Sequence, residues 1–206
     1  MLGGDCMSDE RVYIVDDDKE VRESLGFLLE VAGFEVQSFA SAKEFLADRG
    51  PKHGCLITDV RMPDMTGLEL QERIIHRRIA LPVIIMTGHA DVPLAVQTMR
   101  AGAIDFLEKP LRGELIIASV QRALKVNSQA ISRAMEREAA REQLSLLTPR
   151  EHAVLEKLVQ GCSNKVAAHE LGISSRTVEV HRARITEKLH ASGLSELVRV
   201  ALAARL

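Results

Sequence analysis

The sequence has few cysteines and no long apolar run, and each absence excludes a class of protein. Its three cysteines, Cys6, Cys55 and Cys162, form neither a CxxC pair nor a metal-ligand spacing, so they are best interpreted as reduced structural thiols. No run of about 18 apolar residues is present, which argues against a membrane span. Residues 1–10 also lack the basic and apolar parts of a signal peptide. These absences predict a cytoplasmic protein with no membrane partner.

Charge is distributed unevenly along the 206 residues, although the net charge is only −2. Residues 1–125 hold 15 Lys and Arg against 20 Asp and Glu, a net of −5. Residues 126–206 hold 12 against 9, a net of +3. An acidic first part joined to a basic second part suggests two domains with two roles, and the basic part is suited to a polyanion.

The first part alternates short apolar runs with amphipathic stretches. The apolar runs, each about four residues long and rich in branched side chains, lie at 12–15, 36–39, 55–58, 83–86 and 104–107. Such runs are typical of strands buried on both faces of a parallel sheet. Helical patterns at 20–32, 41–46, 67–75 and 92–101 separate them, and another follows from residue 114. This alternation predicts a doubly wound, flavodoxin-like α/β domain with a five-stranded parallel sheet.

The second part is helical throughout. Residues 114–147 contain neither Pro nor Gly, so they form either one long helix or a broken helix with a flexible middle. Beyond residue 146 the caps and glycines predict four short helices, with helix-turn-helix geometry around Gly172 and a second helix at 175–190. We therefore divide the chain into a domain at 10–125, a helical linker at 126–145 and an all-α domain at 146–206.

Polar side chains gather at the expected carboxyl ends of the strands. Asp16 and Asp17 follow the first strand, Asp59 ends the third, Thr87 ends the fourth and Lys109 follows the fifth. The carboxyl ends of neighbouring strands in a doubly wound sheet form its ligand crevice. Clustered carboxylates need a cation, and oxygen ligands suit Mg²⁺. A carboxylate can also attack phosphorus to form an acyl phosphate, so these residue types fit phosphoryl transfer onto an aspartate.

A structural role is the alternative for some of these residues. Asp16, Asp17 and Asp18 are also what the first turn of a helix favours, and we expect Asp18 to be the cap. Lys109 alone would be an ordinary solvated lysine, but it precedes Pro110, where a cis peptide bond would aim its side chain.

Four motifs in this part resemble those of two-component response-regulator receiver domains. They are VDDD at 15–18, DVRMP at 59–63, MTG at 86–88 and DFLEKP at 105–110. The resemblance implies that Asp59 is the phosphoacceptor, and that Asp16, Asp17, Asp59 and the backbone carbonyl of Arg61 hold Mg²⁺. It also implies that Lys109 contacts the phosphoryl group. One departure is Thr66, where the family often has Asp.

The same resemblance implies a switch and a dimer interface. Thr87 and Phe106 would be the switch pair, moving together when Asp59 is phosphorylated. The fourth helix and fifth strand would form a homodimer on phosphorylation. Apolar contacts there would supply most of the affinity, because exposed ion pairs contribute about 0–1 kcal/mol each. The expected dimer-face residues are Asp91, Val92, Val96, Met99, Arg100 and Asp105.

The helix at 175–190 is the expected DNA-reading element, since the second helix of a helix-turn-helix enters the major groove. Arg176, Glu179, Val180 and Ala183 are placed to meet base edges. Other side chains, suited to phosphates or flanking that face, would position the helix: Lys165, Ser174, Ser175, Thr177, Arg182 and Lys188. A small helical bundle with a solvated charged face is the alternative that helical patterns alone leave open.

A second resemblance favours DNA binding. LTPRE at 147–151, NK at 164–165 and TVEVHR at 177–182 resemble the LuxR-type DNA-binding domain, and the whole chain is most similar to FixJ-type regulators. The expected partners are a sensor histidine kinase and double-stranded promoter DNA, with RNA polymerase a further candidate. The expected function is transcription regulation rather than enzymatic turnover.

Two rival functions are each compatible with part of the sequence. One is a phosphorylation-independent DNA-binding protein whose receiver serves only as a dimer scaffold. The other is an aspartyl-phosphate phosphatase, which needs a second Asp two residues after its nucleophile, where this chain has Arg61.

Overall fold

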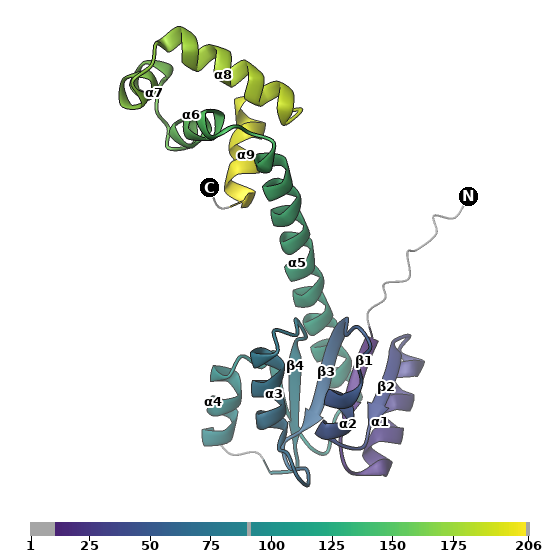
Figure 1. Cartoon of the computed structure of the whole chain (residues 1–206). Helices are drawn as coiled ribbons and strands as arrows, with labels where there is room; N and C mark the ends of the chain where they lie inside the picture. Colours follow the sequence, from purple (N-terminus) through teal and green to yellow (C-terminus); the bar gives the residue numbers. More distant parts are fainter. Residues whose placement is uncertain (1–10, 90–91, 205–206) are drawn as a thin grey trace, which may run out of the picture. The chain divides into compact units, whose positions relative to one another are not determined.

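The computed structural model describes residues 11–89 and 92–204, and the chain forms two compact units. The first unit ends at Gln129 and the second begins at Ala130. Figure 1 shows a sheet flanked by helices in the first unit and helices alone in the second. Among the described helices, none is both long enough and apolar enough to cross a bilayer.

A five-stranded parallel sheet is the centre of the first unit. Its strands are β1 (Arg11–Val15), β2 (Glu35–Phe39), β3 (Gly54–Asp59), β4 (Val83–Thr87) and β5 (Asp105–Glu108). They are ordered β2-β1-β3-β4-β5, and every pairing is parallel. The predicted fold class is confirmed, and each strand lies within about two residues of its expected position because apolar branched runs have few alternatives in a buried sheet.

Four helices connect the strands of this sheet: α1 (Lys19–Val31), α2 (Ala42–Ala47), α3 (Gly67–His76) and α4 (Val92–Arg100). Local side chains fix where they begin. Asp18 caps α1, accepting hydrogen bonds from the N–H groups of Glu20 at 2.8 Å and Val21 at 3.4 Å, as expected. Thr66 and Glu69 form a capping box at the start of α3. The departure at Thr66 is thus a helix cap.

The two faces of the sheet bury separate apolar clusters. On one face Phe45 is fully buried against Tyr13 and Phe39, with its ring centroid 5.8 and 5.3 Å from theirs in edge-to-face geometry. On the other face Ile14, Ile57 and neighbouring strand residues meet α1 and the first part of α5. Burial on both sides holds the strand ends rigidly, and those ends carry the candidate site.

A single helix, α5 (Gly113–Ser145), follows β5 and extends into the second unit. The structure therefore has the long helix rather than the broken one. Ile116, Val120 and Ala123 are buried in the first unit, whereas Ala140 and Leu144 are buried in the second. Between these two anchored ends most side chains of the helix are exposed.

The second unit contains the four predicted short helices: α6 (Pro149–Val159), α7 (Asn164–Leu171), α8 (Ser175–Lys188) and α9 (Leu194–Ala204). Gly172 ends α7 with a left-handed φ of 64°, a conformation that glycine adopts without the steric cost of a Cβ. Ser174 then caps α8. Val178, Ile185 and other inward residues of α8 pack with α6, α7 and α9 in one core.

Candidate functional site

The first candidate site lies where β1 and β3 end. Val15 pairs with Thr58 in the parallel register, so Asp16 and Asp59 follow at the same level on neighbouring strands. Both carboxylates are buried, with residue exposures of 1% and 6%. The Lys109 ammonium, from the loop after β5, lies 2.8 Å from Asp16 Oδ2 and 2.7 Å from Asp59 Oδ1. Three of the predicted residues therefore converge, from three strand ends.

The backbone around this site fixes the two carboxylates. Asp16 Oδ1 accepts a hydrogen bond from the Asp18 N–H at 2.9 Å, and Asp59 Oδ2 accepts one from the Arg61 N–H at 2.6 Å. The Lys109–Pro110 peptide bond is cis, as expected. Gly67 allows the start of α3 to approach, because a Cβ there would lie 2.2 Å from the Asp59 carbonyl oxygen.

Two carboxylates share one ammonium here. Burial raises the pKa of Asp16, and the nearby Asp59 charge adds to that effect against the hydrogen bonds from Lys109 and the Asp18 N–H. For Lys109, burial is the largest single influence and favours the neutral amine. The hydrogen bonds and charges of Asp16 and Asp59 together outweigh it and raise the lysine pKa. With both carboxylates ionised, the pocket would carry one more negative than positive charge, which a further cation would balance.

The remaining predicted metal ligands lie less deeply. Asp17 is exposed, and so is Arg61, of which only the backbone carbonyl is a predicted ligand. In the part of the chain that the structure describes, no three His, Cys, Asp or Glu side chains converge closely enough to hold a metal ion. The assignment of Mg²⁺ to this pocket therefore stays a prediction, supported by the buried carboxylates that a cation already bridges.

The predicted switch pair lies beside the pocket. Thr87 ends β4 and is buried, with its hydroxyl 3.2 Å from both the N–H and the carbonyl oxygen of His89. The Lys109 N–H donates to the Thr87 carbonyl oxygen at 2.8 Å. Phe106 is half-buried and packs against the core on one face of the sheet. Their role as a switch remains a prediction.

The expected dimer face is partly apolar and partly engaged within the chain. Val92, Val96 and Met99 expose 76%, 44% and 47% of their surface on α4, and Arg100 is also exposed. The Asp105 carboxylate, however, accepts hydrogen bonds from Ser119 and from Arg122 on α5, the latter at 3.1 Å. Asp91 lies outside the described residues. An ion pair from Asp105 to a second chain would therefore compete with these two partners.

The second candidate site is the outer face of α8. Six predicted DNA-contact residues are exposed: Lys165, Ser174, Arg176, Glu179, Val180 and Ala183. Four are half-buried: Ser175, Thr177, Arg182 and Lys188. A pocket of about 570 Å³ lies beside this face, between α8 and the start of α7, and its lining includes Lys165, Ser175, Glu179 and Arg182. The face thus combines cations, hydroxyls and small apolar groups.

Several polar groups on this face already have partners within the unit. Ser174 Oγ accepts from the Thr177 N–H at 3.1 Å, and Arg182 donates to Asn164 Oδ1 at 2.9 Å. The Lys188 ammonium lies 2.7 Å from Glu151 Oε2 and 3.2 Å from the Leu146 carbonyl oxygen. A phosphate contact by Lys188 would therefore compete with a buried carboxylate.

One exposed cation on α8 was not predicted. Arg184 is exposed and stands four residues after Val180, on the next turn of the helix. The spacing of four residues, which places side chains on one face, was the signal that would have found it.

Comparison with known proteins gives two family matches. Residues 12–121 match the family described as "Response regulator receiver domain", and residues 145–201 match "Bacterial regulatory proteins, luxR family". "Transcriptional regulatory protein FixJ" of Bradyrhizobium diazoefficiens is 46% identical over 195 residues, which are 94% of this chain and 95% of that protein. The protein of the same name from Rhizobium meliloti is also 46% identical, over 96% of this chain and 97% of its own.

Solved structures agree with the sequence relatives. The response regulator StyR is 41% identical and aligns with a TM-score of 0.79 over 94% of this chain and 98% of its own. Full-length FixJ from B. japonicum is 43% identical, with a TM-score of 0.59 over 96% of this chain and 98% of its own.

Proposed function

Since the chain belongs to the FixJ-type response regulators, which join a receiver domain to a luxR-family DNA-binding domain, we propose that phosphorylation of Asp59 controls its binding to promoter DNA. The phosphoryl group would come from a sensor histidine kinase. The observation that carries the proposal is the Lys109 ammonium between two buried carboxylates, Asp16 and Asp59, at adjacent strand ends. Membership in this family makes the protein a transcription regulator rather than a conventional enzyme.

The transfer uses Asp59 as the nucleophile. One carboxylate oxygen attacks the phosphorus of a phosphohistidine, the new O–P bond forms as the N–P bond breaks, and the imidazole leaves with the bonding electron pair. Lys109 is positioned to turn from Asp59 toward the equatorial oxygens, because its ammonium already lies 2.7 Å from Asp59 Oδ1. Thr87, buried at the end of β4, supplies a hydroxyl from a neighbouring strand.

Asp16, Asp59, Asp17 and the Arg61 carbonyl would hold Mg²⁺. When bound, Mg²⁺ would offset the negative charge that gathers on the phosphoryl oxygens. The excess negative charge of the pocket favours a cation there, and Asp16 is held for it by the Asp18 N–H. Lys109 then remains free to neutralise the other side of the phosphoryl group.

Thr87 and Phe106 pass the signal from the pocket to the surface. In the unphosphorylated chain Thr87 Oγ1 bonds to the backbone of His89, so its movement toward a phosphate requires this bond to break. Phe106 would then turn further inward into the space released. The change is a population shift between two packings, driven by contacts that only the phosphorylated state makes.

Phosphorylation would lead to a dimer through α4 and β5. Val92, Val96 and Met99 supply the exposed apolar surface. We expect beryllofluoride, an acyl-phosphate mimic, to double the mass in solution at micromolar protein, as measured by light scattering. An unchanged mass would contradict this part of the proposal.

The dimer would place two copies of α8 in successive major grooves. Arg176, Glu179, Val180 and Ala183 then meet base edges, while Lys165 and the hydroxyls at the start of α8 contact phosphates. Binding should depend strongly on salt, because each neutralised phosphate releases counterions.

The proposal is tested by footprinting across the genome with wild type and Asp59→Asn side by side. Loss of phosphorylation-dependent sites in the variant supports it. Identical footprints would favour the rival in which the receiver acts only as a dimer scaffold. The phosphatase rival lacks its second acid, since Arg61 stands there and uses its backbone N–H to orient Asp59.

A further inference from the structure

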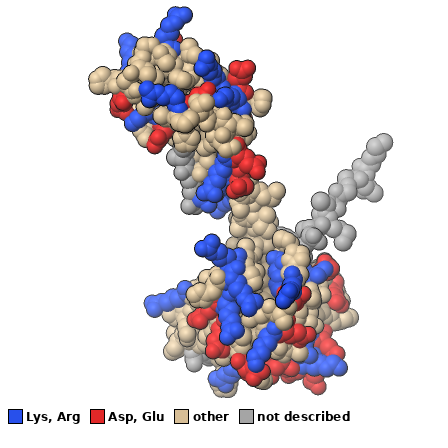
Figure 2. Space-filling view, in the orientation of Figure 1, with Lys and Arg blue, Asp and Glu red and all other residues tan. Residues whose placement is uncertain are grey.

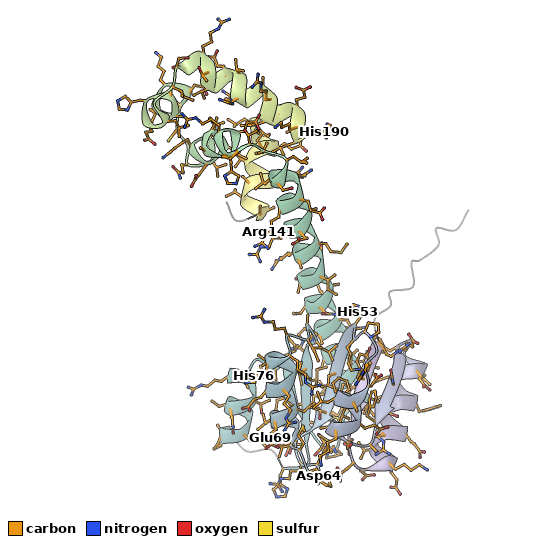
Figure 3. The ribbon with its side chains drawn as sticks, in the orientation of Figure 1. His53, Asp64, Glu69, His76, Arg141 and His190 are labelled. Atoms are coloured by element: carbon orange, nitrogen blue, oxygen red, sulfur yellow. The ribbon has the colours of Figure 1, made fainter. Side chains whose placement is uncertain are left out.

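A basic surface lies at the edge of the receiver sheet opposite the phosphoacceptor pocket. We call it the amino edge, because the strands of the parallel sheet begin there. Figure 3 shows His53 and His76 at this edge and Asp64 at the opposite end of the same unit. In Figure 2 a cluster of Lys and Arg side chains covers the visible face near the end of α3. The residues that form the amino-edge surface are all exposed: Arg49, His53, His76, Arg77 and Arg78.

Two arginines of this surface have no polar partner among the described residues. Arg77 donates to the Leu46 carbonyl oxygen at 3.1 Å, so the end of α3 is joined to the end of α2. The nearby carboxylate, Asp48, is taken by the Lys52 ammonium at 2.7 Å. Within residues 11–89 and 92–204, neither the Arg49 nor the Arg78 side chain has a hydrogen-bond or ion-pair partner. Among the described residues, no carboxylate neutralises these two guanidinium groups, which are suited to an external anion.

The backbone at Arg78 carries a steric cost. Arg78 follows the end of α3 with a φ of 56°, in the left-handed region. Glycine is the usual residue at this position after a helix, because an L side chain there is disfavoured. Arg78 keeps this left-handed backbone conformation although a glycine there would adopt it without steric cost, which points to a use for the arginine side chain.

Stabilisation of a helix end explains only part of the surface. Cations near a helix C-terminus interact favourably with its dipole, and His76 and Arg77 are placed for that at the end of α3. Arg49 lies beyond the end of α2, and Arg78 lies beyond the cap of α3, where the effect falls off. The helix dipole therefore leaves these two arginines unexplained.

We propose that the amino edge of the receiver binds the phosphodiester backbone of double-stranded DNA outside the segment read by α8. The inference rests on the proposed function, which brings the chain onto DNA. Guanidinium groups suit phosphate, since their fork of donors matches two phosphate oxygens. A protein partner would need more apolar surface than α3 offers, where Ile75 is the one large apolar side chain more than half exposed.

The test compares wild type with the double variant Arg49→Ala/Arg78→Gly, using the full chain activated with beryllofluoride. Each is titrated with a short duplex that holds only the two half-sites and with a longer duplex that adds flanking sequence. Arg78→Gly removes the charge and the strained φ together, so we expect the melting temperature to stay the same or rise. Lys43→Ala is the matched control, because Lys43 is an exposed cation on α2 paired with Asp64 at 3.0 Å.

We expect the double variant to bind the short duplex as wild type does and the longer duplex more weakly. Each lost phosphate contact lowers the slope of log affinity against log salt by about 0.9. The activated dimer would lose two contacts in each protomer, so between 50 and 200 mM salt the variant's affinity should fall about 150-fold less than that of wild type. Lys43→Ala and Arg78→Lys should both keep the wild-type slope.

Three results would overturn the proposal. If wild type and the double variant had equal slopes of log affinity against log salt on the longer duplex, the arginines would make no phosphate contact. If the double variant bound both duplexes more weakly by the same factor, the arginines would act through overall charge and not through a contact with flanking DNA. A change in oligomeric mass, with DNA binding unaltered, would make the partner an acidic protein surface. Failure of wild type to bind even the short duplex would instead contradict the proposed function.

Discussion

Glu151 joins the start of α6 to the end of α8 in the DNA-binding unit, and removal of its charge is predicted to destabilise that unit in a pH-dependent manner. Its carboxylate, with the side chain only 4% exposed, lies 2.7 Å from the Lys188 ammonium at the end of α8. It also accepts from the Thr148 N–H at 2.8 Å and the Thr148 hydroxyl at 2.9 Å, which completes the capping box of α6. We propose Glu151→Gln as the perturbation, because it keeps the shape and removes the charge.

The expected magnitude follows from the pKa of this carboxyl. The Lys188 hydrogen bond, followed by that of the Thr148 N–H, lowers the Glu151 pKa from 4.5 to about 2. At about 1.4 kcal/mol per pKa unit, the ionised carboxylate contributes at most about 3 kcal/mol to the free energy of unfolding. Lys188 is 36% exposed, so solvent screening reduces this to about 2 kcal/mol.

The sign of the pH dependence is fixed by the lowered pKa. Stabilisation is fully present above about pH 4.5, where the carboxyl is ionised in both folded and unfolded chains. It is lost progressively as the pH falls toward 2, because the unfolded chain takes up the proton first. The difference in unfolding free energy between wild type and Glu151→Gln should therefore be about 2 kcal/mol at pH 7 and shrink below pH 4.5.

Urea unfolding followed by circular dichroism at a series of pH values measures this difference. Tyr13, the single tyrosine of the chain, lies in the receiver, so its fluorescence reports the unfolding of that domain. The urea midpoint of this signal should be the same in wild type and Glu151→Gln, which makes it an internal control. Glu196→Gln is the matched variant: Glu196 caps a helix through Ser192, but its partner Arg199 is exposed, and the effect should be smaller. A difference in unfolding free energy between wild type and Glu151→Gln that stays constant from pH 7 to pH 2 would refute the reasoning.

Three further predictions follow from contacts in both units. Phe45→Ala should cost about 3–5 kcal/mol in urea unfolding followed by Tyr13 fluorescence, because it empties a fully buried aromatic site; a cost below 1 kcal/mol would contradict that packing. Gly67→Ala should cost about 1–3 kcal/mol and slow phosphorylation, since its Cβ would lie 2.2 Å from the Asp59 carbonyl oxygen; wild-type phosphorylation kinetics would argue against that close approach. Arg182→Ala should weaken DNA binding on all sequences, whereas Glu179→Ala should change base preference; a footprint unchanged by both would contradict the assigned orientation of α8.

Local sequence patterns predicted the receiver fold because its strands leave little choice. The apolar runs around Ile14 and Ile57 are buried on both faces, and the parallel topology then brings every strand's carboxyl end to one edge. The meeting of Asp16, Asp59 and Lys109 followed from that topology alone. Asp18 was likewise predicted as a cap, because capping depends on the next few residues only.

Contacts between distant residues were not predicted, because local patterns do not encode them. The engagement of Lys188 by Glu151 spans 37 positions, and that of Arg182 by Asn164 spans 18. No local pattern indicated that Ser119 and Arg122 hold Asp105, a residue assigned to the dimer face. Lys188, Arg182 and Asp105 were each assigned to an external partner from their charge and their place on a helix or strand. Their partners in the fold depend on how helices pack.

Chemical mapping of the acyl phosphate tests most directly whether Asp59 accepts the phosphoryl group. The full chain is incubated with Mg²⁺ and a small phosphodonor, reduced with borohydride, digested and analysed by mass spectrometry. We predict that one phosphoryl group is added to wild type, that reduction marks Asp59, and that Asp59→Asn gains none. A mark on Asp16 or Asp17, or phosphorylation of Asp59→Asn to the wild-type level, would contradict the account.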